Sequence, residues 1–218
     1  LIRSRDYAAD IDIEFRVRDD DTTVIDAFVK THDRWTISLD GSWLKEGRTM
    51  VEVYDANFLG TGDRLSIKSY FHRKDFGYHG NVFSYDMPNV IGTFFRSNIT
   101  FGKSFEDKIF SIGIQKDFIK PTDYNLGTAY SDNTDKYYQL YADTSDMIKY
   151  GKFDVWAGKS YYIKPLKSSI YVTGKYGLSR FRLRPDEPLG PVSAEINPAF
   201  HDYDEALFGL GLYREKFY

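Results

Sequence analysis

Long runs in which apolar and polar residues alternate are the feature of this sequence that most constrains its fold. In one run Phe110, Ile112 and Ile114 alternate with small or polar residues. Alternation of this kind places successive side chains on opposite faces of a β-strand. Helical periodicity is almost absent. The sequence therefore predicts an all-β protein.

The alternating runs are separated by turn-forming residues, and several exceed ten residues. That is longer than the five or six typical of strands in water-soluble proteins, and it matches the roughly 9–11 residues that a tilted strand needs to cross a bilayer. The strands predicted beyond residue 33 cover 34–43, 48–55, 64–73, 76–86, 91–102, 107–119, 123–131, 137–143, 148–163, 168–184 and 205–214.

Composition agrees with membrane-spanning strands. The chain has 18 Tyr and 17 Phe, yet hydrophobic residues are only 42% of the total and charged residues reach 28%. Aromatic girdles around a polar lumen produce this combination in transmembrane β-barrels. A net charge of −3 disfavours a nucleic-acid partner, and the absence of cysteine excludes disulfides and thiolate metal sites.

Connections of two lengths are also predicted. Short ones are expected at 73–75, 87–90 and 103–107, and long polar ones at 131–136 and 185–204. Transmembrane barrels place short turns on one side and longer loops on the other, so the two kinds are expected at opposite ends of the sheet.

The alternation also predicts which side chains face lipid and which face a lumen. The side chains expected to face lipid are mainly apolar, and those expected to face the lumen are polar. The residues expected to face lipid are Ile67, Ser69, Phe71, Phe95, Ile99, Ile112 and Ile114, and those expected to face the lumen are Lys68, Arg96, Asn98 and Gln115.

The turn at residues 57–63 combines two glycines with an apolar pair. Gly60, Gly62 and Asp63 are expected to supply positive φ angles, because these residue types adopt them at low cost. Phe58 and Leu59 are unusual in a turn exposed to water. We expect this apolar pair to lie at a membrane or periplasmic rim.

The first 33 residues differ from the rest of the chain. A strand over 11–17 carries charges on every second residue, and such a face cannot be presented to lipid. A return strand is predicted at 23–30, and we expect the apolar face of the pair to pack against a helix. The charged residues are Asp12, Glu14, Arg16 and Arg18, and the apolar ones are Ile11, Ile13, Phe15 and Val17.

Catalytic and metal-binding patterns are not evident. His72 and His79 flank one predicted hairpin, although two ordinary surface histidines are favoured over a zinc site. The acidic run 132–135 is interpreted as a solvated turn in preference to a calcium loop. No nucleophile elbow, phosphate loop or metalloprotease helix occurs. We predict no enzyme activity, no cofactor and no metal.

Several segments resemble motifs of one known family. "DANFLGTG" (55–62) resembles its "N-L-L-G-T/S-G" turn, and "TVIDAFVKTHDRWTI" (23–37) resembles the junction between the last periplasmic POTRA module and the first barrel strand. "MPNVIGTFFRSNITF" (87–101) resembles an "N-x-x-G-T-F" strand, and "IQKDFIKP" (114–121) an "R-x-F-x-x-P" segment, of versions found in Bacteroidetes-type bacteria. "FDVWAGKSYYI" (153–163) and "FRLRP" (181–185) follow in the same order.

The family is that of the outer-membrane assembly insertases, the BamA/TamA-like bacterial surface antigen superfamily. The resemblance implies an antiparallel transmembrane β-barrel, with residues 34–218 as its N-terminal part, about ten of the sixteen strands of the family barrel. Because such a part would not close on itself, its first strand, 34–43, and its final segment, 206–214, are not expected to pair with each other. Residues 1–33 would be the end of a POTRA-like periplasmic module. The family's Val/Ile-Arg-Gly-Phe/Tyr motif and its C-terminal β-signal are absent, which is why only the N-terminal part is expected.

The same resemblance implies a function in the outer membrane of Gram-negative bacteria. The first barrel strand would pair poorly with the last and would form a lateral gate at which client outer-membrane proteins are inserted or translocated. The expected partners are the lipid bilayer, client proteins, accessory lipoproteins and the remaining barrel strands on the same or another chain. The gate strand would include Trp35, Thr36, Ile37, Ser38 and Leu39, and the family turn would include Asn57, Phe58, Leu59, Gly60 and Gly62.

Two other functions remain open from the sequence. The first is a structural or channel-forming barrel, or a surface antigen without insertase activity. The second is a soluble β module that binds a lipid or a carbohydrate, which would require apolar residues facing inward. Reconstitution separates a pore from an insertase, and partition into detergent argues against the soluble module.

Overall fold

A computed structural model of the chain describes most of its residues. No helix in this part of the chain is long and apolar enough to cross a membrane. The described residues are 8–18, 23–33, 35–44, 47–74, 77–118, 123–138, 145–166, 168–184 and 200–214.

Nearly all of the regular structure is β-strand, as the alternating sequence predicts. The only helical turns among the described elements are two short 3-10 turns, η3 (Val90–Gly92) and η4 (Lys164–Leu166). The strands are β1 (Ala8–Val17), β2 (Ile25–Asp33), β3 (Ile37–Trp43), β4 (Arg48–Phe58), β5 (Asp63–His72), β6 (Tyr78–Met87), β7 (Arg96–Ser104), β8 (Asp107–Lys116), β9 (Tyr124–Tyr138), β10 (Ser145–Ile163), β11 (Ser168–Leu183) and β12 (Tyr203–Arg214).

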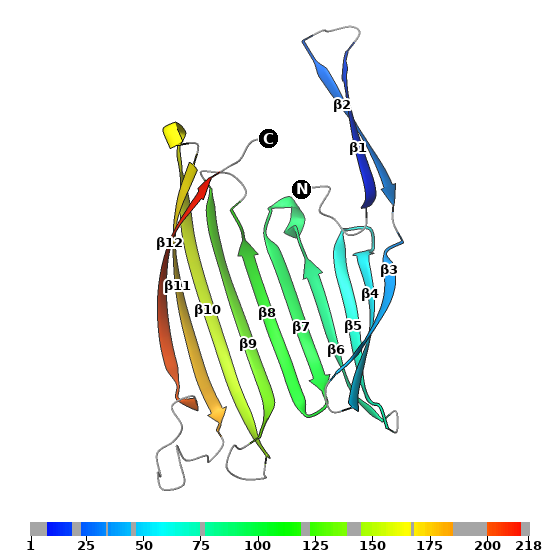
Figure 1. The fold of residues 1–218 in the computed structure, drawn as a ribbon, viewed down its shortest axis with the longest axis vertical. Coiled ribbons are helices and arrows are strands. Elements are labelled where there is room, and N and C mark those ends of the chain that lie inside the picture. The colour runs from blue at the N-terminus through cyan, green and yellow to red at the C-terminus, as the bar shows by residue number, and fades with distance from the viewer. Residues whose placement is uncertain are drawn as a thin grey trace.

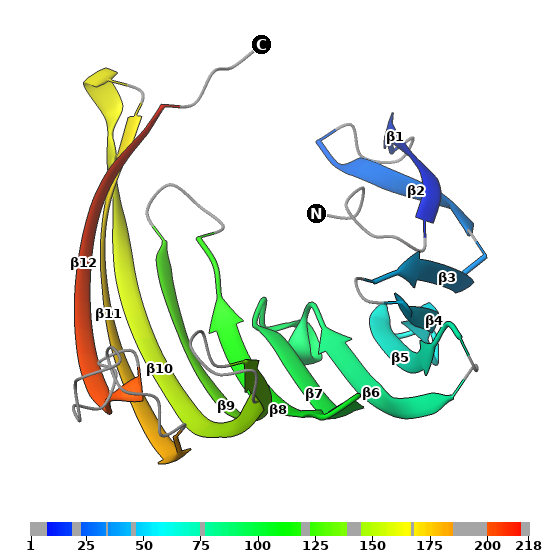
Figure 2. The same cartoon turned by 60° about the horizontal axis from the view of Figure 1, so that its bottom comes forward.

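Strands β3 to β12 form one ten-stranded antiparallel sheet in which each strand pairs with its neighbours in the chain (Figure 1). The sheet curves into an open trough (Figure 2). Strands β3 and β12 are the two ends of the strand order and do not pair with each other. The prediction that the first and last barrel strands of this chain stay unpaired is therefore confirmed.

Strands β1 and β2 form a separate antiparallel hairpin that extends beyond the end of the sheet at which β3 begins (Figure 1). Its register places Ile13 opposite Val29 and Phe15 opposite Ala27, so the apolar residues share one face. Phe15 is 71% exposed. No helix among the described residues covers this face, so the predicted packing against a POTRA-like helix stays a prediction.

Charged side chains cover the other face of the hairpin. Glu14 contacts Arg16 at 2.7 Å and Lys30 at 3.1 Å. The hydrogen bond from Arg16, followed by that from Lys30, holds the pKa of the Glu14 carboxyl below its ordinary value. These contacts lie on the surface, where ion pairs contribute little to stability.

The predicted strand 91–102 begins too early. Strand β7 starts at Arg96, because Ile91 and Phe94 have positive φ angles of 49° and 63° and cannot continue a strand. Asn89 stabilises this kink, since its Oδ1 accepts the Phe94 N–H at 2.8 Å. Phe95 precedes the ladder, so the register does not test whether it faces lipid, and that part of the expectation stays a prediction.

The predicted loop at 131–136 is also wrong. Strand β9 runs without a break through the acidic run that was interpreted as a solvated turn. Both neighbouring strands pair with it, for example at Asp132, which lies opposite Phe110 on β8 and Gly151 on β10. Its polar side chains bond across the sheet, as where the Tyr150 hydroxyl donates to Asp135 at 2.9 Å. The strands predicted at 123–131 and 137–143 are thus one strand.

Short and long connections do not separate to opposite ends of the sheet. Strands β5, β7 and β11 run in the same direction, so the connections that follow them leave the sheet at one end. This end therefore receives the short connections after His72 and Ser104 and also the long one after Leu183. The prediction placed them on opposite sides and is wrong, because connection length does not reveal strand direction.

Candidate functional site: two faces and an open edge

Cross-strand register divides the ten-stranded sheet into two chemically different faces. Residues directly opposite each other on paired strands share a face. On what we call the outer face, one row runs through Leu39, Val53, Ile67, Phe83, Phe101 and Phe110, and it continues on β9 to β11 through Asp132, Gly151 and Arg180. On the inner face, the neighbouring row crosses all ten strands through Ser38, Tyr54, Ser66, Ser84, Thr100, Ser111, Ser131, Lys152, Ser179 and Tyr203.

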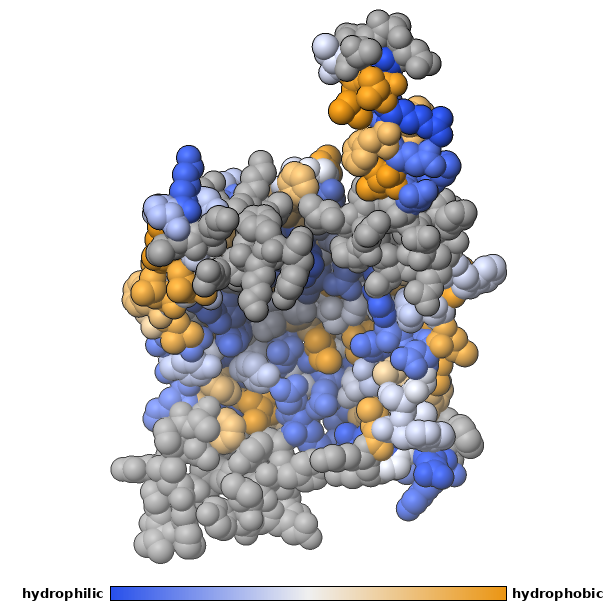
Figure 3. Space-filling model, turned by 45° about the horizontal axis from the view of Figure 1, so that its top comes forward, coloured by the Kyte–Doolittle hydropathy of each residue, from blue (hydrophilic) through white to orange (hydrophobic). Residues whose placement is uncertain are grey.

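The inner face is the concave one. Side chains on a concave surface converge and shield one another, and inner-face Ser66 and Ser179 are buried. Outer-face Ile112 and Val155 are exposed although they are apolar. Figure 3 looks into the hollow, where hydrophilic residues predominate and apolar residues lie along the flanks. The sheet thus presents mainly polar groups to its hollow and mainly apolar groups outward, with charged exceptions such as Asp132 and Arg180 on the outer face of β9 and β11.

Ion pairs link neighbouring strands on the inner face. Glu52 on β4 contacts Arg64 on β5 at 3.2 Å and Lys68 at 4.0 Å. Lys175 on β11 lies 3.0 Å from Asp154 on β10 and 3.5 Å from Glu205 on β12. These two groups of partly buried charges are therefore paired from strand to strand, which offsets the cost of removing them from water.

The predicted division of side chains between the two faces matches the register. Ile67, Ile99, Ile112 and Ile114 share the outer face with Ser69. Phe71 lies opposite outer-face Thr49. The residues expected in the lumen, Lys68, Arg96, Asn98 and Gln115, all lie on the inner face.

The predicted gate strand lies at the β3 edge of the sheet. Ile37, Ser38 and Leu39 are the first residues of β3, whereas Trp35 and Thr36 precede it. Thr36 still joins the ladder, because its carbonyl oxygen accepts the Ala56 N–H at 2.9 Å. Of the predicted strand 34–43, Arg34 lies outside the described residues.

Backbone hydrogen bonds show which groups of β3 remain open. The Ala56 N–H bonds to the Thr36 carbonyl, and the Leu44 N–H bonds to the Arg48 carbonyl at 2.9 Å. In an antiparallel pair, hydrogen-bonded and non-hydrogen-bonded positions alternate. Even-numbered β3 residues therefore point their N–H and C=O groups toward β4. The groups of Ile37, Leu39, Gly41 and Trp43 point away from the sheet.

The predicted turn motif closes the β4–β5 hairpin. Asn57 organises it, since its carbonyl oxygen accepts the Gly60 N–H at 2.8 Å and its side-chain Oδ1 accepts the Gly62 N–H at 2.7 Å. Gly60 and Gly62 have positive φ angles of 75° and 77°, as predicted. The third such residue is Leu59, with φ of 54°, and not Asp63 as predicted.

Asp63 has a different role in this hairpin. Its carboxylate accepts the Tyr85 hydroxyl at 2.6 Å, which ties the turn to β6. The Phe58 ring packs edge-on against the ring of Tyr85, with centroids 6.2 Å apart. Leu59 has no such cover and is 82% exposed. The apolar pair is thus divided between a packed ring and an open leucine.

The two histidines that flank the predicted hairpin, His72 and His79, lie near each other. The rings of His72 and His79 have centroids 6.3 Å apart, and His79 stacks on Phe105. Phe105 is buried, and the Arg48 guanidinium lies over its ring. No cluster of three or more potential metal-ligating residues occurs in the described part of the chain. Sequence reasoning missed Phe105 as the centre of this group.

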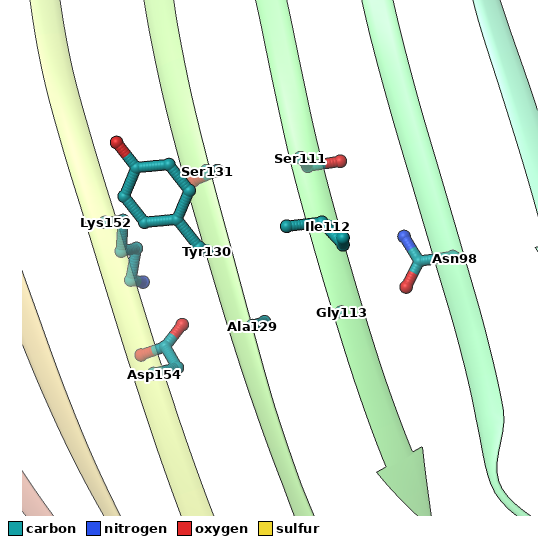
Figure 4. Close-up of a pocket in the computed structure, with 9 residues that line it drawn as sticks. All are labelled: Asn98, Ser111, Ile112, Gly113, Ala129, Tyr130, Ser131, Lys152 and Asp154. Carbon is teal, nitrogen blue, oxygen red and sulfur yellow. The ribbon is translucent and has the colours of Figure 1, made fainter.

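A shallow pocket lies between β7 and β10 (Figure 4). It encloses about 90 Å³, far below the roughly 300–1,000 Å³ of sites for organic ligands. Small residues open it, since a Cβ on Gly113 would approach Asn98 Oδ1 to 3.0 Å. Lys152 and Asp154 of β10 line its other side (Figure 4). The pocket is a small dent in the inner face.

Comparisons with known proteins find similarity among solved structures. No family model matches the chain, and no curated protein matches it. The chain is similar to the crystal structure of BamA from Haemophilus ducreyi lacking POTRA domains 1–3, at 17% sequence identity and a TM-score of 0.41. The match covers 82% of this chain and 42% of that chain, so this chain spans less than half of its length. A likeness at this level assigns no activity.

Proposed function

We propose that residues 34–218 form part of the wall of an outer-membrane β-barrel of the assembly insertase type. The observation that supports a membrane location is the separation of the two faces. A mainly apolar outer face suits lipid when the strands bond laterally to one another, and each of the strands β4 to β11 pairs with a neighbour on both sides. The polar, ion-paired inner face suits a water-filled lumen.

The open groups on β3 support the finer proposal of an insertase. Unpaired N–H and C=O groups in hydrocarbon each cost several kcal/mol, on the order of the penalty for burying an unbonded amide. A strand of a client outer-membrane protein that pairs with Ile37, Leu39, Gly41 and Trp43 would satisfy them by β-augmentation. Strand pairing of this kind needs no nucleotide, metal or cofactor, so the activity we propose is not enzymatic.

The proposal also specifies what lies next to this part of the barrel. Strand β12 is completed by the remaining barrel strands, supplied by the same or another chain. Residues 1–33 lie in the periplasm as the end of a POTRA-like module, since the charged face of β1 is unsuited to lipid. Accessory lipoproteins are further expected partners at that end.

The test is whether the protein accelerates the folding of another outer-membrane barrel in liposomes. Leu39→Pro removes one edge N–H without removing a bond to β4, and should abolish most of the acceleration. Leu39→Ala keeps the N–H and serves as the matched control. Equal activity of the two variants would exclude pairing at β3 as the source of the acceleration.

A channel or surface antigen without insertase activity is the second candidate. The observation in its favour is the polar inner face, which would line a pore once the sheet is closed. Conductance across a planar bilayer, with no effect on the folding of other barrels, would support this candidate over the insertase.

A further inference from the structure

The open edge of β3 carries a side-chain hydrogen bond that strand pairing alone does not explain. The Asp40 carboxylate accepts the N–H of Gly41 at 2.7 Å. Gly41 is one of the residues whose backbone groups point away from the sheet. One donor that a partner strand would use is therefore already occupied by the neighbouring side chain.

Asp40 also lies in an unfavourable electrostatic position. Its directly opposite residue on β4 is Glu52, another carboxylate on the inner face. Glu52 is neutralised by Arg64 and Lys68 of β5. Like charges directly opposite each other in a sheet are destabilising. The hydrogen bond with Gly41 is the contact that the structure assigns to the exposed Asp40 carboxylate.

A strand that pairs with β3 would place one of its own residues opposite Asp40. That residue would point into the hollow, with its Cβ about 4.5–5.5 Å from the Asp40 Cβ. A lysine or arginine there would bind the carboxylate and balance the charge beside Glu52. Once the carboxylate moves to this cation, the Gly41 N–H becomes free to join the new ladder. The same cation thus supplies charge pairing and releases a backbone donor.

Strand β12 cannot supply this cation. It runs antiparallel to β3, as a strand closing the sheet would, but its inner-face residues are uncharged or acidic. Glu205 is one of them and is already paired with Lys175. The described inner-face positions of β12 are Tyr203, Glu205, Leu207, Gly209 and Gly211. Charge complementarity at Asp40 therefore calls for a strand that the described residues do not contain, with a cation on its inner face.

We propose that β3 selects client strands that carry a lysine or arginine at the inward-facing position opposite Asp40. This inference rests on the proposed function, because it specifies which strand the edge accepts. The occupant is a strand of another polypeptide, antiparallel to β3 like every pair in the sheet. Asp40 acts as a specificity-determining residue that also covers the edge while no client is bound.

Disulfide trapping tests the proposal, because the natural chain has no cysteine. Ser42→Cys places a thiol on the inner face of β3, two residues from Asp40. Synthetic strands with alternating apolar residues carry a cysteine opposite position 42 and lysine, glutamine or glutamate opposite position 40. The rate of crosslinking to the full chain in lipid nanodiscs is measured for each peptide.

The lysine peptide should crosslink about two- to fivefold faster than the glutamine peptide, with glutamate slowest. Asp40→Asn should remove the preference, and Asp40→Lys should reverse it in favour of glutamate. Glu205→Gln, on the inner face of the opposite edge, is the matched control and should leave the preference unchanged.

Three results would overturn the inference, and they differ in what they say of the proposed function. If all peptides crosslink at equal rates, β3 accepts strands without selection by Asp40, and the proposed function stands. If no peptide crosslinks to β3, pairing at this edge fails, and the proposed function fails with it. A preference for lysine that persists in Asp40→Asn would assign selection to another residue and would also overturn the inference.

Discussion

Adjacent residues on the two faces of the sheet differ in a way that reverses the usual relation between polarity and burial. Glu52 on the inner face is 8% exposed, whereas Val53, the next residue on the outer face, is 47% exposed. In water-soluble proteins a glutamate is almost never buried unless it is paired. Here the carboxylate is paired in the hollow and the valine points outward. The comparison indicates two different solvents on the two sides of one sheet.

The largest expected effect comes from placing a cation on each face in turn. Ile112→Arg puts a guanidinium on the outer face and should destabilise the protein by about 2–4 kcal/mol if the site lies at mid-bilayer. Gln115→Arg places the same group on the inner face and should be nearly neutral. Equilibrium unfolding in urea from lipid vesicles measures both. Equal losses would mean that the two faces do not meet different solvents.

A smaller effect is expected when the inner-face ion pairs are broken. Glu52→Gln keeps the shape of the side chain but removes the charge that Arg64 and Lys68 contact, and should cost about 1–2 kcal/mol. The partial exposure of both cations keeps the loss at the lower end of the range for charged pairs. Glu106→Gln, at an exposed turn, is the control and should change the unfolding free energy by much less. An unchanged midpoint of urea unfolding for Glu52→Gln would show that water in the hollow screens these ion pairs as effectively as bulk water does.

On the outer face, ring packing should contribute less than the inner-face charges. The rings of Phe83 and Phe101 stack with centroids 5.4 Å apart. Phe101→Leu keeps an apolar side chain toward lipid but loses the ring pair, which contributes about 0.5–1.5 kcal/mol. Val53→Leu changes an outer-face residue without a ring pair and should have little effect. If the two variants unfold alike, the outer face needs only apolar character and no specific packing.

The smallest effect concerns pH at the turn between β7 and β8. Glu106 contacts Lys136 at 2.6 Å, and this hydrogen bond is the main cause that lowers the pKa of the carboxyl. Because the pKa is lowered, the contact stabilises the fold at pH values above the ordinary glutamate pKa of about 4.3. This stabilisation is lost as the pH falls through the lowered pKa. Unfolding measured between pH 3 and 6 should show a shallower pH dependence in Glu106→Gln than in the natural chain. Identical profiles would show that the contact is too well solvated to matter.

Much of this architecture was predictable from local sequence patterns. The alternation around Ile67, Ile99 and Ile112 assigned these residues to one face because side-chain direction in a strand depends only on position parity. The positive φ angles of Gly60 and Gly62 were likewise predictable from the residue type alone. Leu59 could not be predicted as a positive-φ residue, because its side chain does not favour that conformation and the surrounding turn imposes it.

The candidate site was predictable only in part, since a strand edge depends on which neighbour is missing. Trp35 to Leu39 were expected at the gate from a family resemblance, and the structure places them beside or within the edge strand β3. Asp40 and Gly41 were not singled out, because nothing in their local sequence shows that one caps the other. What distinguishes Asp40 is that it lies opposite another carboxylate, Glu52, and this pairing is known only once the register of β3 and β4 is known.

The sequence by itself determined the strands, their two faces and the main turn, because each depends on residues close together in the chain. Tertiary structure alone decided the continuity of β9 through Asp132 and Asp135, since strands β8 and β10 bond to its polar residues from both sides. It also decided that Ile91 and Phe94 interrupt an alternating run. Register, closure and charge pairing join residues distant in the chain, and a local pattern carries no information about partners it does not contain.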